Sequence, residues 1–161
     1  MRKVSLKVSL LLVVLLLSVA LIGCSGEKTP PAEPEWTISI EGVKDEPITF
    51  TDLDAAKLTQ KDVEAVKTKK DGTEIKENWQ GVSLKDVLDA VGAIDYQGVT
   101  VEAADGYAKD YTLEIINREE TILGLVRDGE ELGEEDGPVQ MVPAGESGNM
   151  YIKNLAKIIV K

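Results

Sequence analysis

Short β-branched segments dominate the second half of the chain and limit most strongly the folds that it can adopt. Segments of this kind, separated by Gly, Asp, Asn or Pro, are typical of strands joined by turns. Five of them follow Gly98, and they are VTVEAA (99–104), YTLEII (111–116), TILGLV (121–126), VQMV (139–142) and AKIIV (156–160). The sequence therefore predicts a sheet-rich domain.

Further strands are predicted before these segments. Apolar and polar residues alternate over 36–40, which is the pattern of a half-buried strand. Two more segments, 63–70 and 73–79, flank Asp71-Gly72, a dipeptide suited to a tight hairpin turn. These two segments are expected to pair.

Two capping patterns predict helices among the strands. Thr51 is followed three residues later by Asp54, as in a capping box. Ser83 begins a similar pattern, and apolar residues at helical spacing predict an amphipathic helix over 83–91. With roughly seven or eight strands, the fold class expected is α+β, mainly β with mixed sheets and two or three short helices.

The first 23 residues have the layout of an export signal. Basic residues precede an uninterrupted apolar run over 10–17, and small residues follow it. The apolar core is shorter than the about 20 residues that a membrane-spanning helix needs. Residues 1–23 are therefore predicted to be a signal peptide that is removed.

The sequence LIGC, which ends at Cys24, resembles the bacterial lipobox. In lipoproteins with this motif, the cysteine is diacylated on sulfur and becomes the first residue of the mature chain. Two acyl chains are what stable anchoring requires. The resemblance implies lipidation of Cys24 and a location at the cell membrane, facing outside the cytoplasm. The alternative is an ordinary signal peptide with an incidental cysteine.

The segment after the cysteine has the composition of a tether. Residues 25–35 contain half of the prolines of the chain and no large apolar side chain, so they cannot bury enough surface to fold. The predicted organisation is a signal peptide over 1–23, a lipidated cysteine with a flexible Pro-rich tether over 24–35, and one domain over 36–161.

Charge and composition exclude several functions. The chain has no histidine, which removes the usual zinc sites and the Ser/His/Asp and Cys/His nucleophile arrangements. The net charge is −11, and loss of the three basic residues within 1–23 would make it −14. So acidic a protein is not expected to bind nucleic acid.

The order of short motifs in the domain resembles one known family. The motifs, in chain order, are Trp79-x-Gly81-Val82-x-Leu84, Asp105-Gly106-Tyr107, Gly137-Pro138, Val142-Pro143 and Ile152-Lys153. This order is similar to that of the oxidoreductase molybdopterin-binding domain family, over most of 36–161. The resemblance implies a sulfite-oxidase-like fold.

The same resemblance implies molybdopterin as the cofactor, but the residues for it are incomplete. Catalytic members ligate molybdenum through a cysteine just upstream of the W-x-G-V segment, and residues 63–79 contain none. Relatives hold the pterin phosphate with Arg and His, whereas the mature chain has only Arg118 and Arg127, with Gln140 at a position that is often arginine. No catalytic residue, no metal ligand and no retained cofactor is predicted from these residues.

Five residues are candidates for binding a cofactor or ligand, and each has a structural alternative. By the resemblance, Asp105 and Tyr107 border the pocket and Tyr111 lies nearby; the alternative is a turn with Tyr107 packed on the sheet. Trp79 either stacks on a planar ligand or packs in the core. Lys153 either meets an anion or is a solvated lysine at a strand edge.

Two loops are given structural interpretations. The acidic run 128–136 lacks the ligand spacing of an EF-hand and is predicted to be a solvated loop between strands. The segment 144–149 is predicted to be an ordinary flexible turn.

Taken together, these observations predict a membrane-anchored extracytoplasmic lipoprotein. Its domain would bind a small ligand or a protein partner, without molybdenum catalysis. One alternative is a molybdopterin-dependent oxidoreductase, or a subunit of a redox complex, with atypical cofactor ligation. Another is a solute-binding lipoprotein that serves a transporter, although one domain of this size lacks the two lobes that such proteins often use.

Overall fold

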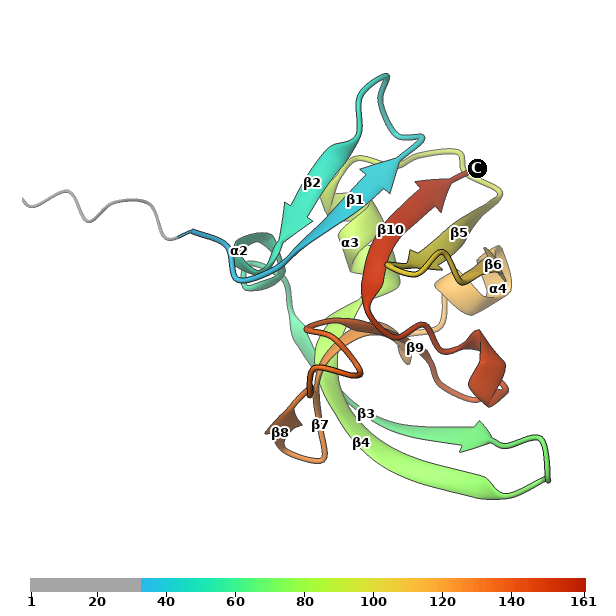
Figure 1. Ribbon diagram of the computed structural model, residues 1–161. Helices are drawn as coiled ribbons and strands as arrows, with labels where there is room; N and C mark the ends of the chain where they lie inside the picture. The colour runs from blue at the N-terminus through green and yellow to red at the C-terminus, as the bar shows by residue number, and fades with distance from the viewer. Residues whose placement is uncertain (1–32) are drawn as a thin grey trace, which may run out of the picture. The chain divides into compact units, whose positions relative to one another are not determined.

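The computed structural model describes residues 33–161. These residues form two five-stranded sheets with short helices between the strands (Figure 1). Sheet A has the order β2-β1-β10-β5-β6. Its strands are β1 (Thr37–Glu41), β2 (Ile48–Thr51), β5 (Gly98–Ala103), β6 (Ala108–Thr112) and β10 (Leu155–Val160). β1 and β10 are parallel and the other neighbours are antiparallel, so sheet A is mixed.

Sheet B is antiparallel throughout and has the order β3-β4-β7-β8, with β9 also paired to β7. Its strands are β3 (Gln60–Thr68), β4 (Glu74–Ser83), β7 (Thr121–Arg127), β8 (Glu130–Glu131) and β9 (Gln140–Pro143). The predicted signal peptide, Cys24 and most of the tether lie outside the described residues.

The helices are short, and side-chain caps begin each α-helix. They are α2 (Asp52–Ala55), α3 (Leu84–Ala90), α4 (Leu113–Ile116) and the 3₁₀ helix η1 (Gly148–Met150). Thr51 and Asp54 form the expected capping box, and the Ser83 hydroxyl accepts a hydrogen bond from the Asp86 amide at 3.0 Å. The predicted fold class, mainly β with mixed sheets and a few short helices, is confirmed.

One predicted strand is wrong in its second half. YTLEII is strand only up to Thr112, and α4 follows directly. Thr112 caps this helix by accepting from the Ile115 amide, and Ile115 and Ile116 are both buried. Adjacent side chains of a strand point to opposite faces, so a helical turn is what places both isoleucines against the core.

The predicted hairpin around Asp71-Gly72 is confirmed and is longer than expected. β3 and β4 pair from Gln60↔Val82 to Thr68↔Glu74. The turn uses Gly72 at φ +86, where a side chain would be strained. The hairpin extends away from the body of the domain at the bottom of Figure 1, which places its turn at the rim of the site described below.

The W-x-G-V motif is built into the packing of sheet B. Trp79 is fully buried, and a Cβ added at Gly124 would lie 2.5 Å from its Cε3 atom. A Cβ at Gly81 would lie 1.9 Å from the Leu123 carbonyl oxygen of β7. The two glycines therefore allow the backbone of β4 and the ring of Trp79 to approach β7 closely.

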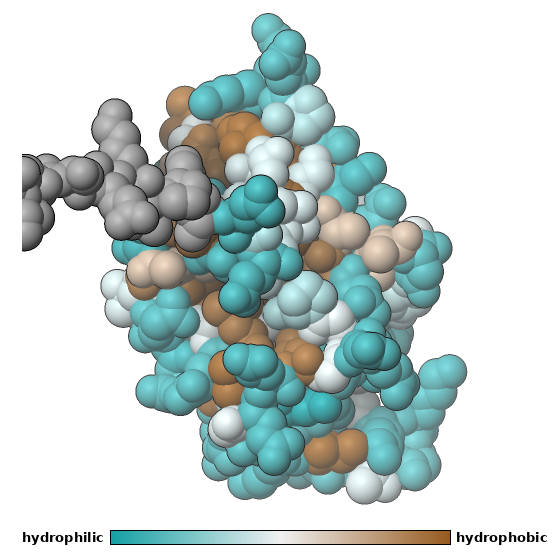
Figure 2. Space-filling model, turned by 60° about the vertical axis from the view of Figure 1, so that its left-hand side comes forward, coloured by the Kyte–Doolittle hydropathy of each residue, from teal (hydrophilic) through white to brown (hydrophobic). Residues whose placement is uncertain are grey.

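The larger hydrophobic cluster joins sheet A and the α-helices with buried residues of β4, β7 and β9, and the smaller cluster around Trp79 lies on sheet B. The face of the molecule in Figure 2 is mostly hydrophilic, and its hydrophobic areas are small and separate. None of the helices in residues 33–161 has the length and apolar character needed to cross a membrane.

Candidate functional site

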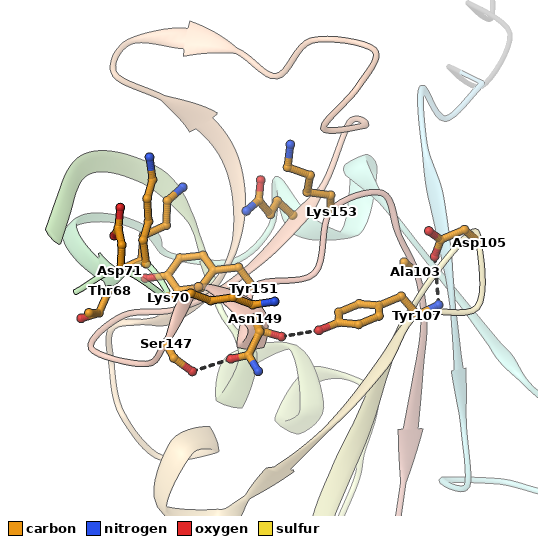
Figure 3. A pocket seen from close by; sticks show the side chains of 14 residues that line it. Thr68, Lys70, Asp71, Ala103, Asp105, Tyr107, Ser147, Asn149, Tyr151 and Lys153 are labelled. Carbon is orange, nitrogen blue, oxygen red and sulfur yellow. Dashed lines mark hydrogen bonds between the residues drawn. The ribbon is translucent and has the colours of Figure 1, made fainter. Parts of the chain in front are cut away.

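An open pocket of about 980 Å³ lies where three segments distant in sequence meet (Figure 3). The β3–β4 hairpin contributes residues 67–71, and the β5–β6 connection contributes Asp105 and Tyr107. Gln140 of β9 and residues between 147 and 153, ahead of β10, complete the wall. A pocket of this volume accepts a small organic molecule.

Three of the five candidate residues line this pocket, and two do not. Asp105, Tyr107 and Lys153 are at its wall. Tyr111 is 1 % exposed, and its hydroxyl donates to the Met150 carbonyl at 2.5 Å. Burial raises the pKa of the Tyr111 phenol well above its usual range, so this hydroxyl stays protonated inside the domain. Tyr111 therefore lies in the core and not at the pocket wall, and its hydroxyl is used within the domain.

Trp79 likewise lies in the core and not at the pocket wall. Its indole N–H donates to Glu77 Oε2 at 3.2 Å, and the Arg127 guanidinium lies 5.5 Å from its ring centroid. Its ring is in contact with sheet B rather than with the pocket. The structural alternative, packing, describes Trp79.

Tyr107 combines the predicted turn with a position at the pocket. Asp105 Oδ1 accepts from the Tyr107 amide at 2.9 Å, and Gly106 has φ +87. The Tyr107 side chain remains 44 % exposed, and its hydroxyl donates to the Asn149 carbonyl at 2.7 Å (Figure 3). This hydrogen bond joins the β5–β6 connection to the segment that carries η1.

The pocket gathers positive charge in an acidic chain. Lys67, Lys69, Lys70 and Lys153 all line it, against two carboxylates, Asp71 and Asp105. This basic site was not predicted from the sequence. The run of lysines at 67–70, next to a hairpin turn, was a usable signal, but the fourth lysine reaches the pocket only through the tertiary fold.

Two of the four lysines are already neutralised by nearby carboxylates. Lys67 Nζ lies 2.7 Å from Glu77 Oε1 and 5.6 Å from the Tyr151 ring centroid. Lys153 Nζ lies 2.6 Å from Asp136 Oδ1. Within residues 33–161, Lys69 and Lys70 form no ion pair.

Two buried polar groups at the pocket have unused hydrogen-bonding capacity. Gln140 is 1 % exposed, and its Oε1 atom has no partner among the described residues. The Tyr151 hydroxyl is likewise unpartnered there. Burial, with the nearby Glu77 and Glu146 carboxylates, raises the pKa of Tyr151 to about 12, so it is a neutral hydroxyl at physiological pH.

The segment 144–149, predicted to be an ordinary flexible turn, is bonded to Arg118 of the α4–β7 loop and to strand β3. The Arg118 guanidinium donates to the Ala144 carbonyl at 3.1 Å and also pairs with the Glu146 carboxylate. The Gly145 amide donates to the Val66 carbonyl of β3. These bonds fix the part of the rim that precedes η1.

The acidic run 128–136 is solvated for most of its length, but the prediction is wrong at its last residue. Glu130 and Glu131 form the exposed strand β8. Asp136 is 7 % exposed. Its carboxylate accepts a hydrogen bond from the Arg127 guanidinium at 2.7 Å and forms an ion pair with Lys153. Asp136 therefore pairs with a lysine of the pocket wall.

Replacing Asp136 with Asn is expected to lower the free energy of unfolding at neutral pH by about 1 to 2 kcal/mol, since charge-assisted hydrogen bonds are lost. Burial alone raises the pKa of Asp136, but hydrogen bonds from Lys153 and Arg127 outweigh it and bring the pKa below its ordinary 3.8. A carboxylate with a lowered folded-state pKa stabilises the fold above its unfolded-state pKa, and this stabilisation is lost as the pH falls through the folded-state pKa. The variant should therefore lose less stability than the wild type in acid.

Chemical denaturation at several pH values, at physiological salt, measures this difference. The matched control is Asp110→Asn, whose carboxylate pairs with Lys161 at 2.7 Å but is 74 % exposed. Exposed pairs contribute little in salt, so this variant should follow the wild-type profile. Identical acid profiles for both variants would contradict the role given to Asp136.

Comparison with known proteins identifies the family. The model of the family described as "Oxidoreductase molybdopterin binding domain" matches residues 27–161, and the chain belongs to this family. The crystal structure of the sulfane dehydrogenase SoxCD from Paracoccus pantotrophus is similar, with a TM-score of 0.70 and 19 % sequence identity. The match covers 80 % of this chain and 39 % of that chain, and at this identity it shows the fold alone. No match was found among curated proteins.

The pocket residues do not fit a molybdenum centre that a protein thiolate ligates. The stretch 63–79, where catalytic relatives are expected to carry the cysteine, presents Lys67 and Thr68 to the pocket. Neither an ammonium nor a hydroxyl replaces a soft thiolate ligand. Among residues 33–161, no three Cys, Asp or Glu side chains are grouped so as to hold a metal ion. The lysines do fit an anionic group.

Proposed function

We propose that this chain is a membrane-anchored extracytoplasmic lipoprotein whose molybdopterin-binding-like domain binds an anionic ligand without molybdenum catalysis. The observation that carries the proposal is the chemistry of the pocket wall. In the stretch where a catalytic member needs a thiolate, the pocket wall carries lysine and threonine side chains. Four lysines in all line the pocket. Family membership supports a binding pocket at this place in the fold.

The proposed location rests on the N-terminal sequence. A basic start, an apolar run and LIGC at Cys24 are what a lipoprotein signal requires. A lipid anchor on Cys24 uses its sulfur in a thioether, so the sole thiol of the chain would be unavailable to a metal. A protein partner at the pocket is the companion proposal, since an open basic pocket also accepts an acidic side chain of another protein.

Metal and pterin analysis tests the loss of molybdenum catalysis. The full chain, expressed in a host that makes molybdopterin and extracted in detergent, should contain far less than one molybdenum atom per chain and no pterin fluorescence after oxidation. A catalytic family member with its cysteine, prepared in parallel, is the positive control. Stoichiometric molybdenum in this chain would overturn the proposal in favour of an oxidoreductase with atypical ligation.

Labelling with a radioactive fatty acid tests the anchor. The wild-type chain, expressed in a bacterial host, should incorporate the label and sediment with membranes. Cys24→Ser should abolish incorporation, because serine cannot form the thioether. Label retained in the variant, or absent from the wild type, would rule out lipidation at Cys24.

A further inference from the structure

We infer that the pocket binds an organic anion, with its charged group at Lys69 and Lys70 and a hydrogen-bonding group at Gln140 and Tyr151. The inference rests on the proposed binding function and adds the chemical class of the ligand. It combines three independent observations, which concern the unpaired charges, the unpaired buried polar atoms and the size of the pocket.

The unpaired charges lie at the hairpin end of the pocket. Lys67 and Lys153 are satisfied by Glu77 and Asp136, so an incoming anion would have to compete with a carboxylate at those two lysines. Lys69 and Lys70 line the same pocket and pair with no carboxylate of the described chain. They are therefore the cations available to a ligand, and their attraction should weaken as salt is added.

The unpaired polar atoms lie on other segments. Buried polar atoms are nearly always hydrogen-bonded, and one left without a partner destabilises the fold. Gln140 is 1 % exposed, lines the pocket and has an unpartnered Oε1 atom. Tyr151 lines the pocket with an unpartnered hydroxyl. A ligand with an N–H or O–H group at this end would satisfy atoms that the protein leaves unpaired.

The size and walls of the pocket favour a ligand with a carbon skeleton. A volume of about 980 Å³ is far more than a bare inorganic anion fills. Ala103 and the rings of Tyr107 and Tyr151 form part of the wall (Figure 3), and such surfaces bind apolar or aromatic groups. The ligand class is therefore an organic carboxylate, phosphate or sulfonate that also carries a hydrogen-bond donor.

Calorimetric titration of the full chain in non-ionic detergent tests the class, with a detergent blank. The probe is p-aminohippurate, which carries a carboxylate at one end and an aromatic amine at the other. We expect it to bind once per chain, and more weakly as salt rises. Its neutral primary amide should bind about tenfold more weakly or not at all. Inorganic phosphate should bind far more weakly than the probe, and equal binding would overturn the organic part of the inference.

The charged end is tested by removing two lysines together. Lys69→Gln with Lys70→Gln should weaken p-aminohippurate binding about tenfold and reduce its salt dependence. The matched control is Lys76→Gln, which removes one charge from the same hairpin but lies outside the pocket, beside Glu64. Equal losses in the control and the double variant would mean that only overall charge matters, and would contradict a site at Lys69 and Lys70.

The polar end is tested by Gln140→Leu, which should change stability and binding in opposite directions. Removing a buried unpartnered amide oxygen is expected to raise the Tm of the ligand-free chain by about 4 °C. The same change should weaken p-aminohippurate binding about tenfold, because the amide can no longer bond to the ligand. Gln140→Met, with similar length and no amide, is the second variant if leucine does not fold.

The outcomes separate this inference from the proposed function. Unchanged affinity in the Gln140 variants, or no binding of the probe at all, overturns the inference and leaves the molybdenum result of the proposed function standing. If stoichiometric molybdenum is found and the probe still binds, the proposed function is overturned, whereas the inferred ligand site remains.

Discussion

Replacing Gly81 with alanine is expected to destabilise the domain by about 3 kcal/mol or more, because the added methyl group has no space. A Cβ at this position would lie 1.9 Å from the carbonyl oxygen of Leu123 and 3.0 Å from the Cα of Gly124. Both neighbours are backbone atoms of β7, so no side chain can rotate away. The two strands would have to separate, and the hydrogen bonds between β4 and β7 would be lost with them.

Urea unfolding followed by far-ultraviolet circular dichroism measures this effect. The matched control is Gly133→Ala, since Gly133 is exposed and a Cβ there meets no atom within 4 Å. The control should unfold within about 0.5 kcal/mol of the wild type. If Gly81→Ala is as stable as the control, the glycine of the W-x-G-V motif does not serve close strand packing.

Replacing Trp79 with alanine is expected to cost about 3 to 5 kcal/mol of stability, which is typical of removing a large buried aromatic side chain. Trp79 is fully buried and is the largest member of the cluster on sheet B, with Val63, Ile122 and Val142. The space opposite its ring is kept open by Gly124. The cavity left by alanine would therefore be lined by rigid strand backbone and could collapse only in part.

The matched control for Trp79 is Tyr107→Ala, in an aromatic residue at the pocket. Tyr107 is 44 % exposed, and its side chain makes one hydrogen bond, to the Asn149 carbonyl. Replacing it with alanine should therefore lower the free energy of unfolding by about 1 kcal/mol or less. Thermal and urea unfolding of both variants separates packing from ligand contact. A stable Trp79→Ala protein that has lost p-aminohippurate binding would instead place Trp79 in the binding site.

The features predicted best are those set by residues close in sequence. The caps at Thr51 and Ser83 depend on a bond to an amide three residues on, and the hairpin at Asp71-Gly72 depends on one dipeptide. The second half of the strand predicted over 111–116 was wrong because the sequence does not show that both Ile115 and Ile116 face the core. That requirement comes from packing against distant segments.

The positions of the candidate residues were harder to infer from the sequence than the fold. Asp105, Tyr107 and Lys153 were named through the family resemblance, and all three line the pocket. Tyr111 and Trp79 carry equally suitable groups, but both are buried in the core. The chemistry of a side chain is readable from sequence, whereas the direction in which it points depends on which face of a sheet is covered.

The sheet-rich fold class, the helix caps, the family resemblance and the lack of a thiolate in residues 63–79 could be inferred without coordinates, because they follow from composition, local hydrogen bonding and motif order. The folded chain was needed to show that lysines of the β3–β4 hairpin and Lys153 meet at one pocket, and that the buried Asp136 pairs with Lys153. These contacts join segments distant in the chain. Their positions are fixed by strand pairing and by packing of the core, which no local pattern of residues specifies.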